Sequence, residues 1–427
     1  MSSFSATQWA RIHAHLSEHE TVYGLPERRN GSLVFSSFNI RKFGKLKRGS
    51  KIKRTSGSWD LLIKFAERCD LLAIQEVGDD LTSVRYLVDK LGDAYHFVAS
   101  DISGGSPGAG GNIERLVYVY RNDKLRPTGL GSDLAYERSD ILRTLYDERE
   151  SFRDDLLIRE AELEKHEIKL VAWRRAVAEW KETGFNAKGG TSKPGKPKKP
   201  PFSINQFLQF IRSPHMVSFR TIGNENIEPY RFIAVNAHLL FGGSNTVWKG
   251  ERLREFKALM DWLIIRADKM ERMFEPNFIL FGDLNLDFER TNIKREQISA
   301  YLKSLNKTRL KKAAKINMPF LNVHPDQESV FRTNARKNQT FDHIAMIASD
   351  RRLPPPHKND EAGRDADGYN YGMFDFVRLF FDVLPDDTKA SSKRPKYSLF
   401  QHDVSDHMPI WIRLEKPKQD QHQFIWR

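Results

Sequence analysis

Short hydrophobic runs alternate with longer amphipathic segments along this chain, and most of the runs end in polar side chains. The run Phe278–Phe281 leads directly into Gly282, after which polar residues occupy every second position: Asp283, Asn285 and Asp287. We interpret the run as a strand buried on both faces, with Gly282 allowing the backbone to turn where it emerges. Alternate side chains of a strand point the same way, so Asp283 and Asn285, and also Asp287 if the strand continues, can converge on one spot.

Two interpretations of this stretch compete. A carboxylate beside an amide oxygen suits a hard divalent cation, or an activated water next to a phosphate. The alternative is a turn in which the Asp and Asn side chains only hydrogen-bond the local backbone. Matching chemistry at other strand ends favours the first interpretation.

The other predicted strands also carry polar or ionisable side chains near their ends. These side chains are Asn39 (strand 32–40), Glu76 (strand 71–77), Glu114 (strand 114–121), Asn236 and His238 (strand 230–239), Asp342 (strand 340–346), and Asp406 and His407 just before a closing strand. A carboxylate at the tip of an apolar strand is unfavourable without a partner, so Glu76 either binds a metal ion or forms a salt bridge at the sheet rim. A lone histidine such as His238 is more often structural than catalytic.

Amphipathic segments between the strands predict helices, including a short one within residues 1–31 that carries Trp9, Ile12 and Leu16. At 427 residues, the chain can form two ordinary domains or one large α/β domain with insertions. Residues 132–201 differ from the rest, because a long charged helical sequence is followed by a Lys/Pro/Gly-rich tether. We predict a helical insertion that docks a protein partner or a nucleic acid, or else covers the core.

The charge balance favours an acidic partner. Lys and Arg outnumber Asp and Glu by 69 to 56, which gives a net charge of +13 and favours a nucleic acid or an anionic surface over a merely basic soluble protein. The basic loop 41–54 and a basic helix at 296–316 are either solvated surfaces or phosphate contacts. With one cysteine, no apolar stretch of membrane-spanning length and no signal-peptide core, we expect a cytoplasmic protein.

Taken in chain order, the strand-end motifs resemble the endonuclease/exonuclease/phosphatase superfamily, and most closely its deoxyribonuclease I-like branch. The motifs are SFNIRKFG with Asn39, IQEV with Glu76, ERLVYVYR with Glu114, the Arg212-Ser-Pro segment, NAHL, GDLNLD, FDHI and SDHMP, spread over about residues 32–413 apart from the insertion. The resemblance implies a four-layer α/β sandwich, in which two mixed sheets pack together between helices and the strand ends meet in one cleft. It implies a catalytic domain over 32–427 that is interrupted by the 132–201 insertion, with 1–31 as a helical extension.

The resemblance also implies a metal site and an attacking water. Asn39 and Glu76 would hold Mg²⁺, for which Mn²⁺ can substitute, and Asp406 would be a second carboxylate near the metal. Asp283 and Asn285 would position and activate the water.

Two carboxylate–imidazole pairs are implied as the acid and the base. His407, oriented by Asp342, would act as general base, and His238, oriented by Glu114, would protonate the leaving oxygen. Each carboxylate would fix the tautomer of its ring and raise its basicity.

The resemblance implies that Asn236 contacts the scissile phosphate and that Arg212 contacts a phosphate too, and we add Arg41 as a further candidate for substrate binding. The sequence departs from the family at Val77 and Gly78, where the secreted nuclease has an arginine that enters the minor groove. Its tyrosine before the Glu-Arg strand and its disulfide are absent too, so the core chemistry carries over but this mode of duplex binding does not. Arg41, the loop 42–54 or the insertion could replace it.

We therefore predict a metal-dependent endonuclease that hydrolyses nucleic acid, DNA in the first place. One alternative is a phosphoesterase acting on a lipid or inositol phosphate headgroup, although FDHI at Phe341–Ile344 replaces the Trp-Cys-Asp-Arg signature of phosphoinositide phosphatases. Another is a non-catalytic protein on a nuclease scaffold, which the intact set of catalytic residue types argues against.

Overall fold

The computed structural model describes the chain except for residues 1–3, 47–53, 104–112, 135–137, 201–209, 224–226, 242–245, 269–273, 276, 287–292, 309–314, 365, 367, 389–396 and 418–427. The chain divides into two compact units. The first comprises Met1–Ala135, Phe210–Phe241 and Phe256–Arg427, and the second comprises Tyr136–Gln209 and Gly242–Glu255.

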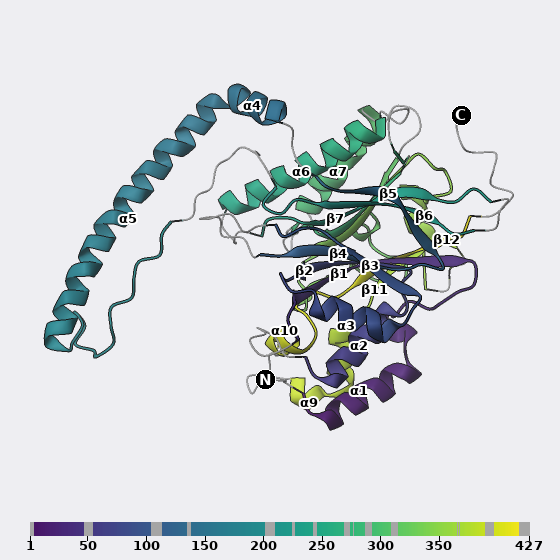
Figure 1. Cartoon of the computed structure of the whole chain (residues 1–427), viewed down its shortest axis with the longest axis horizontal. Coiled ribbons are helices and arrows are strands. Elements are labelled where there is room, and N and C mark those ends of the chain that lie inside the picture. Colours follow the sequence, from purple (N-terminus) through teal and green to yellow (C-terminus); the bar gives the residue numbers. More distant parts are fainter. Residues whose placement is uncertain are drawn as a thin grey trace. The chain divides into compact units, whose positions relative to one another are not determined.

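Within its described residues, the first unit contains two mixed sheets of six strands each (Figure 1). The first sheet has the order β11 (Asn370–Met373), β12 (Ile410–Glu415), β1 (Ser32–Phe43), β2 (Leu71–Val77), β4 (Arg115–Arg121) and β3 (Tyr95–Ala99). The second has the order β5 (Leu125–Asp133), β6 (His215–Thr221), β7 (Arg231–His238), β8 (Phe278–Asp283), β10 (Asp342–Ala348) and β9 (Lys315–Asn317).

Each sheet has one parallel pair at its centre and antiparallel neighbours around it. The parallel pairs are β1 with β2 in the first sheet and β7 with β8 in the second. Parallel strands end at the same edge of their sheet, and an antiparallel neighbour begins there. The polar ends of the central strands and the starts of their neighbours therefore gather at one end of each sheet, where the central strands finish.

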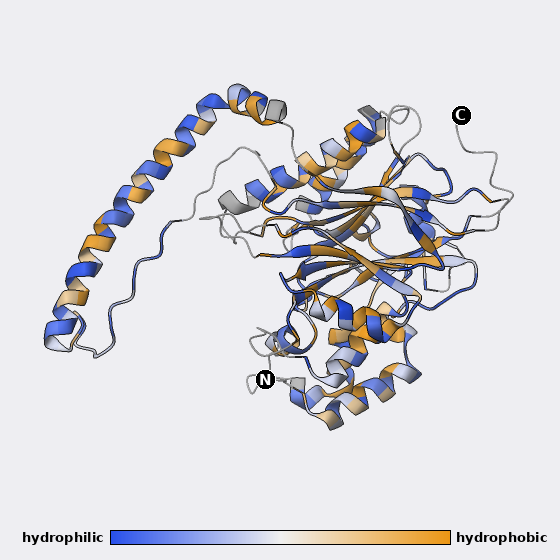
Figure 2. Ribbon diagram, in the orientation of Figure 1, coloured by the Kyte–Doolittle hydropathy of each residue, from blue (hydrophilic) through white to orange (hydrophobic). Residues whose placement is uncertain are grey.

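The core lies between the sheets, and helices cover the outer faces. Aromatic side chains bridge the two sheets, for example Phe35 of β1 and Phe232 of β7, whose ring centroids lie 5.3 Å apart. Figure 2 shows hydrophobic residues concentrated along the strands and on the inward faces of the helices. The helices of one face are α1 (Ala6–Glu18), α2 (Ser56–Ala66), α3 (Thr82–Leu91) and α8 (Phe376–Val383), and those of the other are α6 (Thr246–Asp268, from Phe256 on) and α7 (Ile293–Thr308). The predicted four-layer α/β sandwich is confirmed.

Short helical segments connect these elements. In the described residues they include α9 (Pro385–Thr388), α10 (Phe400–Asp403) and 3₁₀ turns at Thr21–Tyr23, Pro319–Leu321, Pro356–Glu361 and Tyr397–Leu399. Among the described helices, none is both long and apolar enough to cross a membrane.

The edges of the sheets differ most from the sequence prediction. The prediction missed β5, β9 and β11, and it extended the basic helix to residue 316, whereas α7 ends at Thr308 and Lys315–Asn317 forms β9. β9 and β11 have three and four residues, which is too short to show the alternation of apolar and polar positions that marks a strand. In β5, Pro127 and the glycines that follow resemble a loop, and the pairing with β6 is irregular between Pro127 and Gly131.

The N-terminal helix is part of the outer layer of the first unit. It begins with a capping box in which Ser5 and Gln8 satisfy each other's backbone N–H groups. Its buried face, formed by Trp9, Ile12 and Leu16, packs with α2 and α8. The amphipathic pattern of this segment thus reflects helix packing.

The second unit consists mainly of α4 (Arg138–Asp147) and the long helix α5 (Arg149–Thr183). A segment without regular structure follows α5 and runs back beside it (Figure 1). The sequence predicted the helical character of this insertion and placed its start at residue 132, whereas β5 extends to Asp133.

Gly282 is required where β8 meets β7. Its φ is +150°, and a Cβ at this position would overlap the carbonyl oxygen of Ala237 on the neighbouring strand. We expect Gly282→Ala to lower the free energy of unfolding by about 3 kcal/mol, measured by urea denaturation. Gly131→Ala is the control, because a Cβ there meets nothing within 4 Å. Equal stability of the two variants would contradict this assignment.

Candidate active site

Asp283, the last residue of β8, lies at the centre of the site. In the sheet it is in register with His238 at the end of β7 on one side and with Asp342 at the start of β10 on the other. Side chains directly opposite each other on neighbouring strands project to the same face. The strand pairing alone therefore brings these three ionisable groups together.

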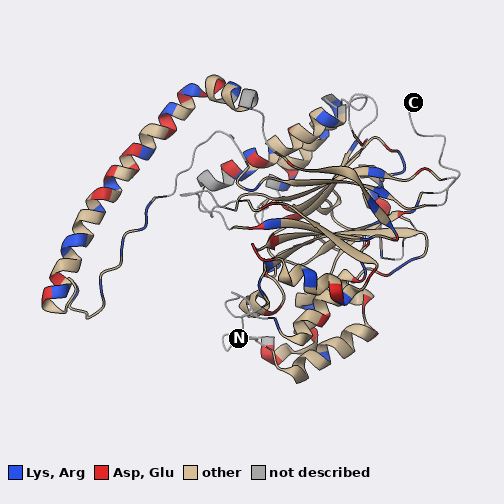
Figure 3. Cartoon of the chain, in the orientation of Figure 1, with Lys and Arg blue, Asp and Glu red and all other residues tan. Residues whose placement is uncertain are grey.

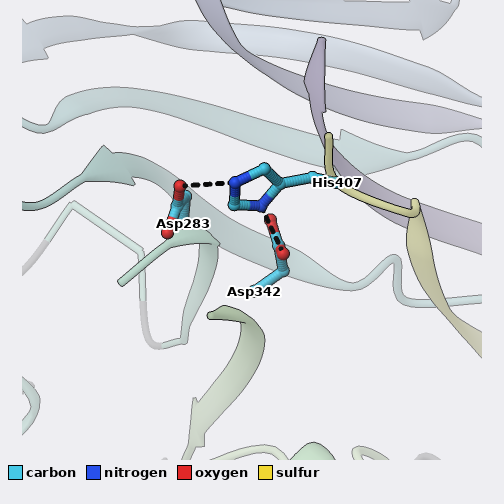
Figure 4. A group of neighbouring side chains, drawn as sticks. All are labelled: Asp283, Asp342 and His407. Atoms are coloured by element: carbon cyan, nitrogen blue, oxygen red, sulfur yellow. Dashed lines mark hydrogen bonds and ion pairs between the residues drawn. The ribbon is translucent and has the colours of Figure 1, made fainter. Parts of the chain in front are cut away.

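His407 reaches this group from the other sheet, since it lies on the loop before β12. Its Nδ1 is 2.8 Å from Oδ2 of Asp342, and its Nε2 is 3.6 Å from Oδ2 of Asp283 (Figure 4). The first distance is a hydrogen bond that fixes the ring, and the second is too long for one. Nε2 thus faces Asp283 without being bonded to it.

His238 forms a second pair of the same kind. Its Nδ1 lies 2.9 Å from Oε1 of Glu114, and its Nε2 lies 3.6 Å from the same Oδ2 of Asp283. Glu114 immediately precedes β4 of the first sheet, so this pair also crosses between the sheets. The guanidinium of Arg212 contacts Glu114 as well, and it donates to the carbonyl oxygen of Leu239 at 3.3 Å.

These contacts shift the proton affinities of the buried groups. Burial lowers the pKa of both imidazoles, but the carboxylates outweigh it: Glu114 raises the pKa of His238, and Asp342 with Asp283 raises that of His407 well above its ordinary value. Burial raises the pKa of Asp342. Burial acts in the same direction on Asp283, yet the two imidazoles hold the pKa of Asp283 below its usual value. These shifts leave a carboxylate of lowered proton affinity between two imidazoles of raised basicity, an arrangement that suits proton transfer beside an anionic phosphate.

Asp283 also has the local role that the alternative interpretation assigned to it. Its Oδ1 accepts a hydrogen bond from the backbone N–H of Asn285 at 3.0 Å, and Oδ2 accepts one from Nδ2 of Asn39 at 2.9 Å. Asn285 has a φ of +49° and donates Nδ2 to the carbonyl oxygen of Leu239 at 2.9 Å. The turn and the site are built from the same carboxylate.

Asn39, Glu76 and Asp406 are the predicted metal ligands, and their oxygen atoms fit a hard cation. Nδ2 of Asn39 lies 3.5 Å from Oε1 of Glu76, while Oδ1 of Asn39 and Oδ1 of Asp406 are buried with no hydrogen-bond partner among the described residues. Oδ2 of Asp406 is held by Arg41 at 2.8 Å. Carboxylate and amide oxygens without a partner are ligands that Mg²⁺ or Mn²⁺ accepts.

A different group of ionisable side chains has the spacing of a metal site. The ligand atoms of Asp283, Asp342 and His407 all lie within 4.8 Å of one another. However, Nδ1 of His407 and the carboxylate of Asp342 are already bonded to each other. This group therefore fits an acid–base pair better than a set of metal ligands.

Asn236, predicted to contact the scissile phosphate, lies deeper, between the two sheets. Its Oδ1 accepts from Nε2 of Gln75 at 2.6 Å, and its Nδ2 donates to the carbonyl oxygens of Ile74 and Val117, each at 3.1 Å. The side chain is 0% exposed. These bonds occupy both ends of the amide, so the geometry supports a structural role in place of the predicted one.

Arg212 is likewise buried, and its guanidinium is directed at Glu114. The predicted phosphate contact is not supported for Arg212, whereas Arg41 remains beside Asp406 with its side chain 25% exposed. Asp287 and residues 47–53 of the basic loop lie outside the described residues.

Two residues near the site had no role in the sequence prediction. Ser405, the first residue of the SDHMP motif, donates to the carbonyl oxygen of Asn39 at 2.7 Å and accepts from the backbone N–H of Arg41 at 3.1 Å. It therefore ties β1 to the loop that carries His407. Its position in the motif was the signal that could have identified it.

Arg54 was counted with the basic loop, but its guanidinium points inward. It donates to the carbonyl oxygens of Arg41 at 2.8 Å and Val404 at 3.0 Å, and it lies over the ring of Phe43. Burial lowers the pKa of Arg54 to about 10, against the opposing effect of three nearby carboxylates. Nothing in the local sequence separates this buried arginine from its basic neighbours.

The structural role of Asn236 can be tested by stability. We expect Asn236→Ala to lower the free energy of unfolding by about 3 kcal/mol, because several buried polar groups lose their partners. Ser37→Ala, which removes only the contacts between Ser37 and Gln75 in the same network, should cost about 1 kcal/mol. An Asn236→Ala variant of normal stability that hydrolyses no phosphodiester would instead support the phosphate contact.

No protein-family model matches the chain, and no curated protein matches it. Among solved structures, an endonuclease/exonuclease/phosphatase family protein from Bacteroides thetaiotaomicron is 13% identical and covers 91% of this chain and 96% of its own, with a TM-score of 0.41. A mannosyl-6-phosphatase of the same organism is 12% identical, covers 89% of this chain and 98% of its own, and has a TM-score of 0.38. The catalytic domain of human Nocturnin is 10% identical, covers 91% of this chain and 95% of its own, and has a TM-score of 0.41. At these identities and TM-scores no activity or residue role is carried over. Many of the matching structures are described as endonuclease/exonuclease/phosphatase family proteins, the family that the ordered motifs resemble.

Proposed function

We propose that this protein is a metal-dependent phosphodiesterase that hydrolyses nucleic acid, with DNA as the first candidate and an internal cut as the mode. One observation carries the proposal. Nε2 of His238 and Nε2 of His407 both lie 3.6 Å from a single carboxylate oxygen of Asp283, and a separate carboxylate orients each ring. Phosphodiester hydrolysis needs a proton acceptor for the attacking water and a proton donor for the leaving oxygen.

The two histidines supply these two functions in the proposed mechanism. His407 accepts a proton at Nε2 from the attacking water, because Asp342 holds Nδ1 and stabilises the imidazolium that forms. His238, held by Glu114, donates its proton from Nε2 to the leaving oxygen. Asp283 lies between both rings and positions the water and the phosphate.

Asn39 and Glu76 would hold the cation, with Asp406 nearby. Their fit rests on the oxygen atoms of Asn39 and Asp406 that are buried and have no hydrogen-bond partner within the described part of the chain. When bound, Mg²⁺ or Mn²⁺ would neutralise the negative charge that develops on the phosphate.

The substrate class rests on charge. A net charge of +13 favours a polyanion over a small neutral molecule, and Arg41 places one cation directly at the site. Hydrolysis of a lipid or inositol phosphate headgroup uses the same chemistry and is the alternative that the experiments separate.

Metal dependence is tested by Glu76→Gln, which keeps the size of the side chain but removes its charge. We expect digestion of plasmid and single-stranded DNA with Mg²⁺ to be abolished by EDTA and to fall by about a hundredfold or more in the variant. Glu67→Gln, at an exposed position at the end of α2, should digest normally. A folded protein that cleaves neither DNA with Mg²⁺ or Mn²⁺, but releases phosphate from an inositol phosphate, would move the function to the alternative.

Substrates with different leaving groups distinguish the roles of the two histidines. On DNA, His238→Ala and His407→Ala should each lower kcat by about 10²- to 10⁴-fold, whereas the exposed His96→Ala should have no effect. On bis(p-nitrophenyl) phosphate the leaving group needs no proton, so His238→Ala should lose little while His407→Ala remains impaired. Equal losses on both substrates would reverse the assignment of His238 as the acid.

A further inference from the structure

The second unit contains a hairpin made of α5 and the segment 191–200, which runs back along it. Side chains of α5 hold the segment by bonds to its backbone: Trp180 Nε1 to the carbonyl oxygen of Thr191 at 2.9 Å, Trp173 Nε1 to that of Pro194 at 2.9 Å, and Arg159 Nη1 to that of Pro200 at 2.7 Å. The lysine- and proline-rich segment is therefore anchored along its whole length.

The spacing of these anchors explains the fit. On α5 they occupy positions separated by seven or fourteen residues, and seven helical residues span about 10 Å. Their acceptors are three or six residues apart, and three residues of a polyproline II helix span about 9 Å. Extended by one repeat, the same spacing pairs Pro197 with His166, a residue that is buried although most of α5 is exposed. Two turns of α5 thus match one turn of the proline segment.

Burial along the segment repeats every three residues, so one face packs against α5 and the other faces are exposed. Pro194, Pro197 and Pro200 are half-buried, whereas Lys193, Lys196 and Lys199 are exposed. The burial repeats every three residues, the period of a polyproline II helix, so these three lysines share a face, with a spacing of about 9 Å if the segment follows that geometry. The ammonium group of Lys196 lies 5.8 Å from the centre of the Trp173 ring.

The charge of this face is not compensated. Residues 184–200 contain five lysines and no acidic residue, whereas acidic and basic residues alternate along α5 (Figure 3). Among the described residues, no carboxylate lies within ion-pair distance of these five lysines. A row of lysines without carboxylate partners among the described residues, on an anchored backbone, matches a polyanion, because the row is already ordered before binding.

We infer that the hairpin formed by α5 and residues 191–200 binds the phosphate backbone of a nucleic acid through Lys193, Lys196 and Lys199. A domain that recognises proline-rich segments is disfavoured, because the prolines face α5 and the carbonyl oxygens of Pro194 and Pro200 are already used. A membrane surface is disfavoured, because residues 191–200 contain no large apolar side chain to insert. The inference rests on the proposed function, since it supplies the nucleic acid that the site would cleave.

The test measures binding without cleavage. The full chain with Lys193→Gln, Lys196→Gln and Lys199→Gln is titrated with fluorescein-labelled single-stranded DNA in EDTA, over about 50 to 200 mM salt. The control is Lys165→Gln, Lys169→Gln and Lys181→Gln, which removes the same charge from exposed positions on α5 itself. We expect the first variant, and not the control, to bind about tenfold or more weakly near 0.1 M salt, with a salt slope smaller by about 2.

The scaffold is tested separately by Trp173→Phe with Trp180→Phe, which keeps an aromatic ring at each position but removes the N–H donors. This variant should weaken binding although every lysine is present, and unchanged binding would overturn the ordered hairpin as the cause. Equal affinity of the two lysine variants for DNA overturns the inference. The same variants are also tested for binding to vesicles that contain anionic lipid, and a loss of vesicle binding without a loss of DNA binding overturns it as well. Lysine-dependent binding by a protein that cleaves no DNA would overturn the proposed function and leave this inference standing.

Discussion

The buried carboxylate of Asp283 is the constraint on which the rest of the site depends. Moving a charge into the protein interior is strongly unfavourable unless other groups compensate it. Here Asn39 and Asn285 donate hydrogen bonds, and two imidazoles face the charge. Asn39 belongs to the first sheet and Asn285 follows a strand of the second, so satisfying Asp283 also joins the two sheets at this edge. Closure of the sandwich and assembly of the site are therefore one event.

The backbone around this carboxylate is held in unfavourable conformations. Glu76 and Asn285 have φ values of +59° and +49°, which cost energy for residues other than glycine. The bond from the N–H of Lys42 to Glu76 and the bond from Asn285 to Leu239 hold these conformations in place. Both residues belong to the predicted metal and water sites. The strain thus lies where side chains must be aimed, which is the expected location when precise positioning is worth more than stability.

Local patterns predicted the position of each functional side chain along its strand, but not the partner that it meets. An apolar run followed by Asp283 predicts a buried strand with a carboxylate at its end, and the same holds for His238. The sequence contains no local sign that Arg212 pairs with Glu114, or that Asn236 joins both sheets, because the partners of Asn236 lie 119 to 162 residues away and Glu114 and Arg212 are also far apart. Asn236 and His238 lie two residues apart on the same face of β7, as two ligands of one site would. However, Asn236 is buried between the sheets, whereas His238 lies at the strand end, in the site. Periodicity determines the face and not the depth.

The proposed active site and the proposed hairpin are both suited to the phosphates of a nucleic acid and not to its bases. Every group around Asp283 is suited to a phosphate or a water, and none of the described site residues presents a contact specific to a base. The lysines of the hairpin are equally indifferent to base sequence, because they oppose a backbone charge. A protein built from these two parts would bind nucleic acid through its charge and cut it by the geometry of the phosphate. Any preference for one site over another would then come from how readily the strand deforms to bring a phosphate between His238 and His407.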